Sequence, residues 1–106
     1  MVRVKINTRT LEITMDGHAN AAPKGQDLVC CAVSILIQTL CLYMEEQERA
    51  GRLAGLKEEI APGHVYLNPQ PYGWSRKDTL TAFNVIRQGM LALAEQYKNH
   101  IRLEEE

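Results

Sequence analysis

The chain has 106 residues, of which 45% are hydrophobic and 24% are charged, and its formal net charge is -1. These values fit one soluble globular domain over residues 1–106 with a single hydrophobic core. A nearly neutral chain has no strong electrostatic attraction for nucleic acid or for an anionic membrane, so we expect neither as a direct partner.

The start of the chain lacks the basic and then apolar pattern of a signal peptide. The longest apolar stretch, residues 28–37, contains Ser34 and is shorter than a membrane span requires. We therefore expect a cytoplasmic protein. Its cysteines, Cys30, Cys31 and Cys41, fall on one predicted helix, which keeps the first and the last about 16 Å apart, and we expect all three to be thiols.

Two short alternating runs open the chain. Apolar and polar residues alternate over residues 2–8 and again over residues 11–16, which is typical of strands with one buried face. Only Arg9 and Thr10 separate the two runs, so we expect them to pair as an antiparallel hairpin.

An apolar segment then predicts a helix from Leu28 to about Arg49 or Arg52, with Asp27 as its N-cap. The first half of this helix is apolar nearly all round. A small two-layer domain covers only one side of a helix, so the second apolar side indicates contact with another subunit, and we expect a homodimer.

The segments 56–61 and 64–68 predict a second hairpin, with Pro62 and Gly63 in a type II turn. Pro69 and Pro71 cannot donate hydrogen bonds to a strand ladder, so we expect the chain to leave the sheet there. Aromatic residues follow, and Tyr66, Tyr72 and Trp74 form either packing anchors or a peptide-binding surface.

Ser75 and Asp78 resemble a capping box ahead of a second long helix. Its apolar stripe recurs every three or four residues: Leu80, Phe83, Ile86, Met90, Leu93, Tyr97 and Ile101. We expect the tail, residues 104–106, to be frayed. The predicted fold is a two-layer α+β sandwich of order ββαββα, with a four-stranded, mainly antiparallel sheet and two long helices.

The stretch from Gly17 to Ser34 carries the candidate chemistry. His18 follows the second strand and Cys30 lies in the first turn of the helix, where unpaired backbone N–H groups favour a thiolate. A loop over residues 20–25 joins them. The pattern alone allows either a His–Cys catalytic pair or an ordinary helix cysteine.

The neighbouring residues have similar alternatives. Cys31 points about 100° away from Cys30, so we assign it to the core or an interface, as we do Cys41. Ser34 either bonds to the helix backbone or lines the site. The cap Asp27 is also compatible with a catalytic role. His64 and His100 are expected at the surface.

A metal site is not expected, because adjacent cysteines on a helix diverge and no CxxC or HxxxH spacing occurs. No cofactor is expected either. A thiol redox sensor is a weaker alternative, since no resolving cysteine lies within reach of Cys30.

Nearly the whole chain resembles the ribosomal-processing cysteine protease family Prp, also called the YsxB-like proteins. The residues that carry the resemblance are Gly17-His18-Ala19, Gly25-x-Asp27-x-Val29-Cys30, Ala32-x-Ser34 and the closing Asn99-His100-Ile101-Arg102-Leu103. The resemblance implies a bacterial, homodimeric endopeptidase that removes a short N-terminal extension from a large-subunit ribosomal protein and so allows ribosome assembly.

In this resemblance the catalytic residues fall on Cys30 and His18, and the supporting motif residues fall on Gly17, Gly25, Asp27 and Ser34. Cys31 stands where the family is expected to carry a small residue. The alternative function is a non-catalytic ribosome-assembly or peptide-binding module of the same fold, which would bind the extension without cutting it.

Overall fold

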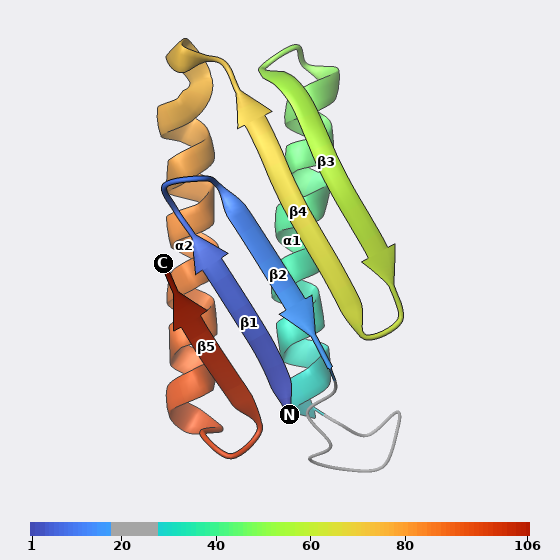
Figure 1. Cartoon of the computed structure of the whole chain (residues 1–106), viewed down its shortest axis with the longest axis vertical. Helices are drawn as coiled ribbons and strands as arrows, with labels where there is room; N and C mark the ends of the chain where they lie inside the picture. Colours follow the sequence, from blue (N-terminus) through green and yellow to red (C-terminus); the bar gives the residue numbers. More distant parts are fainter. Residues whose placement is uncertain (18–27) are drawn as a thin grey trace.

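The computed structural model describes residues 1–17 and 28–106. Its elements follow in chain order: β1 (Val2–Asn7), β2 (Glu12–Asp16), α1 (Leu28–Arg49), β3 (Leu53–Ala61), β4 (His64–Pro71), the short 3-10 helix η1 (Gly73–Ser75), α2 (Arg76–Gln96) and β5 (Ile101–Glu105). The strands form a five-stranded sheet in the order β3-β4-β2-β1-β5. Both helices lie on one face of this sheet (Figure 1).

The α+β class, the two long helices and both hairpins agree with the sequence prediction. The core lies between the sheet and the helices. It is built from the alternating apolar side chains of β1 and β2 and from one side of each helix, with Val4, Ile13, Val33, Phe83 and Met90 among its most buried members. Period-two strands and period-3.6 helices therefore contribute the faces that their patterns predict.

The prediction of four strands in the order ββαββα is wrong, because the end of the chain forms β5 rather than more helix and a frayed tail. The helix α2 ends at Gln96, and β5 runs parallel to β1 with Val2 opposite Ile101. The Val2 N–H donates to the His100 carbonyl oxygen at 2.9 Å. This pairing gives a hydrogen-bond partner to the edge of β1 that β2 leaves open.

The expectation that the chain leaves the sheet at Pro69 is also wrong, since β4 continues to Pro71. The register explains why proline is tolerated there. β2 pairs with β4 only up to Leu67, whereas β3 pairs with β4 as far as Pro71. Beyond Leu67 one side of β4 is therefore a sheet edge, where a missing N–H breaks no ladder bond.

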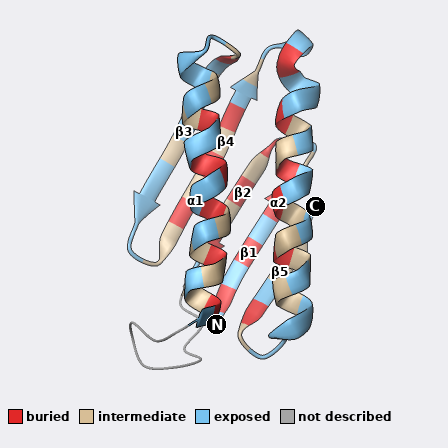
Figure 2. Ribbon diagram, turned by 180° about the vertical axis from the view of Figure 1, so that it is seen from behind, coloured by how far each residue is buried: buried red, intermediate tan, exposed pale blue. Residues whose placement is uncertain are grey.

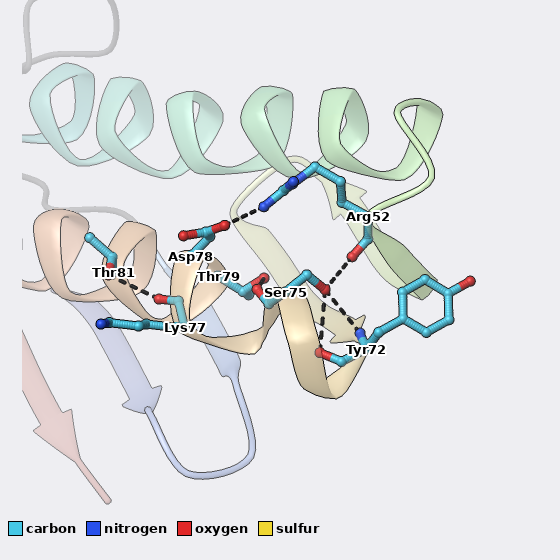
Figure 3. A network of polar contacts seen from close by, with 7 residues as sticks. All are labelled: Arg52, Tyr72, Ser75, Lys77, Asp78, Thr79 and Thr81. Atoms are coloured by element: carbon cyan, nitrogen blue, oxygen red, sulfur yellow. Dashed lines mark hydrogen bonds and ion pairs between the residues drawn. The ribbon is translucent and has the colours of Figure 1, made fainter.

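The predicted capping box at the start of α2 is replaced by a different network (Figure 3). The buried Ser75 hydroxyl donates to the Arg52 carbonyl oxygen at 2.6 Å and accepts the Tyr72 N–H at 3.1 Å. Asp78 forms an ion pair with Arg52 instead of bonding the helix start. Ser75 thus joins the start of β3, the exit of β4 and the start of α2.

The exposed rings of Tyr72 and Trp74 stack with their centroids 5.6 Å apart, and the Arg52 guanidinium lies 5.4 Å from the Trp74 ring centroid. Tyr66 lies elsewhere, on β4, and its hydroxyl donates to the Glu12 carboxylate at 2.7 Å. The three aromatic residues therefore do not form one surface, and only Tyr72 and Trp74 lie together.

Among the described residues, α1 is one helix whose length and composition would allow it to cross a membrane. The predicted apolar stretch, residues 28–37, is too short for a membrane span. The stretch in the structure is longer, because the helix stays largely apolar beyond position 37. The core helix of a folded domain meets the same criteria, and one side of α1 is packed against the sheet: Val29, Val33, Ile37, Leu40, Cys41 and Met44 are buried.

Candidate active site

Three parts of the chain lie close together at one end of the molecule. β2 finishes at Asp16, the β3–β4 turn follows Ala61, and α1 begins at Leu28 (Figure 1). The Gly17 N–H donates to the Gly63 carbonyl oxygen at 2.8 Å, which ties the end of β2 to the hairpin turn. Gly17 and Cys30, the described site residues on either side of the predicted loop, therefore both lie at this end of the molecule.

Gly17 can be only glycine without strain, for two reasons. Its φ is +92°, in the left-handed region that other residues rarely adopt. A Cβ placed on it would lie 2.6 Å from the Met1 carbonyl oxygen, which is backbone and cannot rotate away. The glycine that precedes His18 thus allows β2 to end tightly against the start of β1.

Cys30 is the third residue of α1, within the first turn, as the sequence predicts. Its side chain is partly exposed and packs against the edge of the core. The first four N–H groups of a helix have no partner inside the helix, and they favour negative charge in front of them. A thiolate at position 30 would benefit from this field.

The structure separates the three thiols, none of which is in a disulfide. Cys41 is buried, and its pKa is raised to about 12, first by burial and then by the negative charges of Glu58 and Glu45. Cys31 was predicted to lie in the core or at an interface. It is exposed, so it is not in the core, and the interface stays a prediction. Cys30 alone combines partial exposure with the interior side of the first turn.

Ser34 follows Cys30 by one helical turn and is partly exposed. It lines a cavity between α1 and the β3–β4 hairpin. Ser34 also lines a second surface hollow with Cys31, Ile35 and Gln38, and its role at the site stays a prediction. The other predicted site residues, His18, Gly25 and Asp27, and the predicted loop at residues 20–25 lie outside the described residues.

His64 was predicted only as a surface residue, but it pairs with the strand that leads to the site. Its Nδ1 lies 2.5 Å from Asp16 Oδ1 and its Nε2 lies 3.5 Å from Glu59 Oε2. The hydrogen bond to Asp16, and then that to Glu59, raises the pKa of His64. The signal that sequence reasoning missed is the strand register, which places His64 opposite Asp16.

His100 is partly buried rather than at the surface, because it lies at the junction of α2 and β5 and its carbonyl oxygen accepts the Val2 N–H. Within residues 1–17 and 28–106, no group of three His, Cys, Asp or Glu side chains is arranged to hold a metal ion. The chemistry that these residues support is that of a thiol at a helix start.

Comparison with known proteins gives one family and one fold. The model of the family described as cysteine protease Prp matches residues 1–102. The ribosomal processing cysteine protease Prp of Mycoplasma genitalium is 30% identical over 105 residues, which cover 97% of this chain and 96% of that protein.

Solved structures agree with the fold. The essential ribosomal processing protease Prp from S. aureus with a covalently linked product peptide has a TM-score of 0.78 at 19% identity, with 100% of both chains covered. The same protease with a substrate peptide has a TM-score of 0.70 at 17% identity, over 99% of this chain and 97% of that one. SMU.848 from Streptococcus mutans has a TM-score of 0.64 at 21% identity, over 98% and 90%.

Proposed function

Because the chain belongs to the cysteine protease Prp family, we propose that it is an endopeptidase that removes the N-terminal extension of a large-subunit ribosomal protein. The observation that carries this proposal is the placement of Cys30 in the first turn of α1, which starts at the same end of the molecule where β2 finishes (Figure 1). In this proposal residues 1–106 form one protease domain. Its setting is the bacterial cytoplasm, during ribosome assembly.

The proposed mechanism is nucleophilic acyl transfer by a Cys–His dyad. His18 takes the proton of the Cys30 thiol, and the thiolate attacks the scissile carbonyl carbon. Backbone N–H groups at the start of α1 stabilise the oxyanion, and the amine of the downstream product leaves with a proton from His18. Water then attacks the thioester carbon and releases the acyl product and Cys30. No cofactor or metal takes part.

The supporting residues have separate proposed roles. Gly17 sets the direction in which the chain leaves β2, and Asp27 caps α1 so that its first turn presents Cys30. Gly25 belongs to the loop that joins the histidine to the helix. Ser34 lies one turn beyond Cys30 and lines the cavity between α1 and the β3–β4 hairpin, and its proposed role is to line the site.

Alkylation tests this function against the alternative of a non-catalytic peptide-binding module. At mildly acidic to neutral pH we expect iodoacetamide to modify Cys30 much faster than Cys41, whose pKa of about 12 leaves it protonated. Cys30, Cys31 and Cys41 all lie on the tryptic peptide of residues 25–49. Fragmentation of this peptide in the mass spectrometer after short exposure would locate the label. The exposed Cys31 is the internal control for simple accessibility. Labelling of Cys30 no faster than that of Cys31 would favour the binding module.

A homodimer is the proposed assembly, supported by an apolar stripe on the outer side of α1. Leu28, Ile35 and Leu42 recur every seven residues and all three are exposed, Ile35 by 60%. Figure 2, seen from the helix side, shows exposed residues along this side of α1. Unpartnered apolar stripes of this kind are typical of interfaces. The proposed partners are thus a second copy and the ribosomal extension, with no direct nucleic acid or membrane partner.

We expect sedimentation to give about twice the chain mass of 12.0 kDa. The variant Ile35→Lys should shift the protein to the monomer, because it places charge in the centre of the stripe. Glu95→Lys, which also exchanges an exposed residue for lysine but lies on α2, is the matched control. A wild-type protein that is strictly monomeric at micromolar concentration would contradict the dimer.

A further inference from the structure

The end of β2 is held to the β3–β4 hairpin by two neighbouring interactions. In the backbone, the Gly17 N–H donates to the Gly63 carbonyl oxygen at 2.8 Å. In the side chains, Asp16 Oδ1 lies 2.5 Å from His64 Nδ1, and the strand register places these two residues opposite each other. Asp16 is the last residue of β2 and His64 is the first residue of β4. The two interactions therefore close the last residue pair of the β2–β4 ladder, at the end of the sheet where α1 begins (Figure 1).

His64 lies between two carboxylates, because its Nε2 is 3.5 Å from Glu59 Oε2 on β3. An imidazolium can donate from both ring nitrogens, whereas a neutral imidazole leaves one nitrogen with a lone pair facing a carboxylate. The hydrogen bond to Asp16, and then that to Glu59, raises the pKa of His64. The folded protein therefore favours the positively charged form of this histidine.

A third charged side chain faces the pair from β1. Arg3 lies opposite Asp16 in the β1–β2 register and is exposed. Arg3, Asp16 and His64 each stand next to a buried core residue along their strands, so their side chains point to the face of the sheet away from the helices. Because arginine keeps its charge at all relevant pH values, His64 is the member of this cluster whose charge changes near neutral pH.

We propose that His64 is a positioning residue for the peptidase reaction, which it serves by holding the end of β2 in place through Asp16. The strand β2 has five residues, and the ends of short strands open readily. The chain continues from Gly17 directly to His18, so the direction in which β2 ends sets the point from which the proposed base starts. His64 acts through Asp16 rather than on the reacting atoms. This inference rests on the proposed function, because His18 is the base only in that mechanism.

The expected effect is local and depends on pH. The side chains of His64 and Asp16 are 38% and 55% exposed, so solvent screens their interaction. An exposed ion pair shifts a local opening equilibrium about two- to fivefold. Because the pKa of His64 is raised on folding, the charged pair is fully present below the ordinary value of 6.5. It is lost as the pH rises through the raised value.

The variant His64→Asn tests the inference, because asparagine can donate one hydrogen bond to Asp16 but carries no charge. Tyr66→Phe is the matched control. It removes the hydrogen bond from Tyr66 to Glu12, which also joins β4 to β2 but at the opposite end of β2. The value of kcat/KM for a peptide that spans the ribosomal-protein extension would be measured between about pH 6 and pH 9. Dividing each variant by the wild type at the same pH removes the titration of the dyad that all the proteins share.

We expect His64→Asn to lower kcat/KM about two- to fivefold near pH 6 and to approach the wild type near pH 9. Tyr66→Phe should give a ratio that does not change with pH. His64→Lys keeps a positive charge and should restore most of the rate near pH 6. Amide hydrogen exchange measured by NMR near pH 6 is a second readout. Protection of the Gly17 N–H should fall about two- to fivefold in His64→Asn and stay unchanged in Tyr66→Phe.

Two outcomes would overturn the inference. In the first, His64→Asn cleaves like the wild type over the whole pH range and keeps the protection of Gly17. In the second, His64→Asn and Tyr66→Phe lose activity equally at every pH, so that His64 only stabilises the sheet. Failure of the protease function has a different signature. The wild type would then leave the peptide uncut, while His64→Asn would still lower the protection of Gly17.

Discussion

Replacing Cys30 by alanine should reduce cleavage of a peptide that spans the ribosomal-protein extension by about 10³-fold or more, because the proposed attacking atom is lost. Replacing the adjacent Cys31 by alanine should leave most of the activity, since its side chain is exposed and points away from that of Cys30. The pair is a matched comparison, with the same substitution in the same helical turn. Initial rates measured by chromatography of the two product peptides would give both values.

The two variants should have similar stability, because neither side chain is fully buried. Urea unfolding of each would exclude a folding defect as the cause of lost activity. Full activity in Cys30→Ala would refute the assignment of the nucleophile. Loss of activity in Cys31→Ala, with normal unfolding and normal mass, would move the nucleophile to the neighbouring position.

Replacing Gly17 by alanine should lower both stability and activity. The left-handed φ of +92° costs about 1 to 2 kcal/mol for alanine. Relieving the 2.6 Å approach of the new Cβ to the Met1 carbonyl oxygen adds about 1 to 3 kcal/mol. The backbone would have to move at Gly17, which directly precedes the proposed base His18. We therefore also expect the cleavage rate to fall.

Gly51 provides the control for this prediction. Its φ is +77°, yet a Cβ there would meet nothing within 4 Å. Gly51→Ala should therefore cost only the backbone term of about 1 to 2 kcal/mol and leave cleavage unchanged. Equal losses of unfolding free energy in the two variants would show that the contact of the new Cβ with the Met1 carbonyl oxygen does not contribute to stability.

The local patterns of the chain predict most of its elements. Alternation identified β1 and β2, and the apolar segment that begins at Leu28 predicted α1, which ends at Arg49, one of the two predicted ends. The Pro62-Gly63 pair identified the turn of the second hairpin. These predictions succeed because each rests on neighbouring residues, whose side chains share a face through the period of a strand or a helix.

The predictions that failed depend on partners far away in the chain. Ile101 continues the helical spacing of α2, but it lies in β5 because the open edge of β1, about a hundred residues earlier, offers backbone partners. Pro69 and Pro71 remain in β4 because β2 stops short of them. Asp78 pairs with Arg52, which precedes β3, rather than capping α2.

The candidate site divides in the same way. The amino-acid sequence by itself determined the spacing of His18, Cys30 and Ser34 and the helix that carries the last two, because these depend on residue types close together in the chain. Only the tertiary structure decided that Cys41 is buried and Cys31 exposed, and that Gly17 is held against Met1 and Gly63. The physical reason is that exposure and close approach are set by what packs against a residue, and the packing elements come from distant parts of the chain.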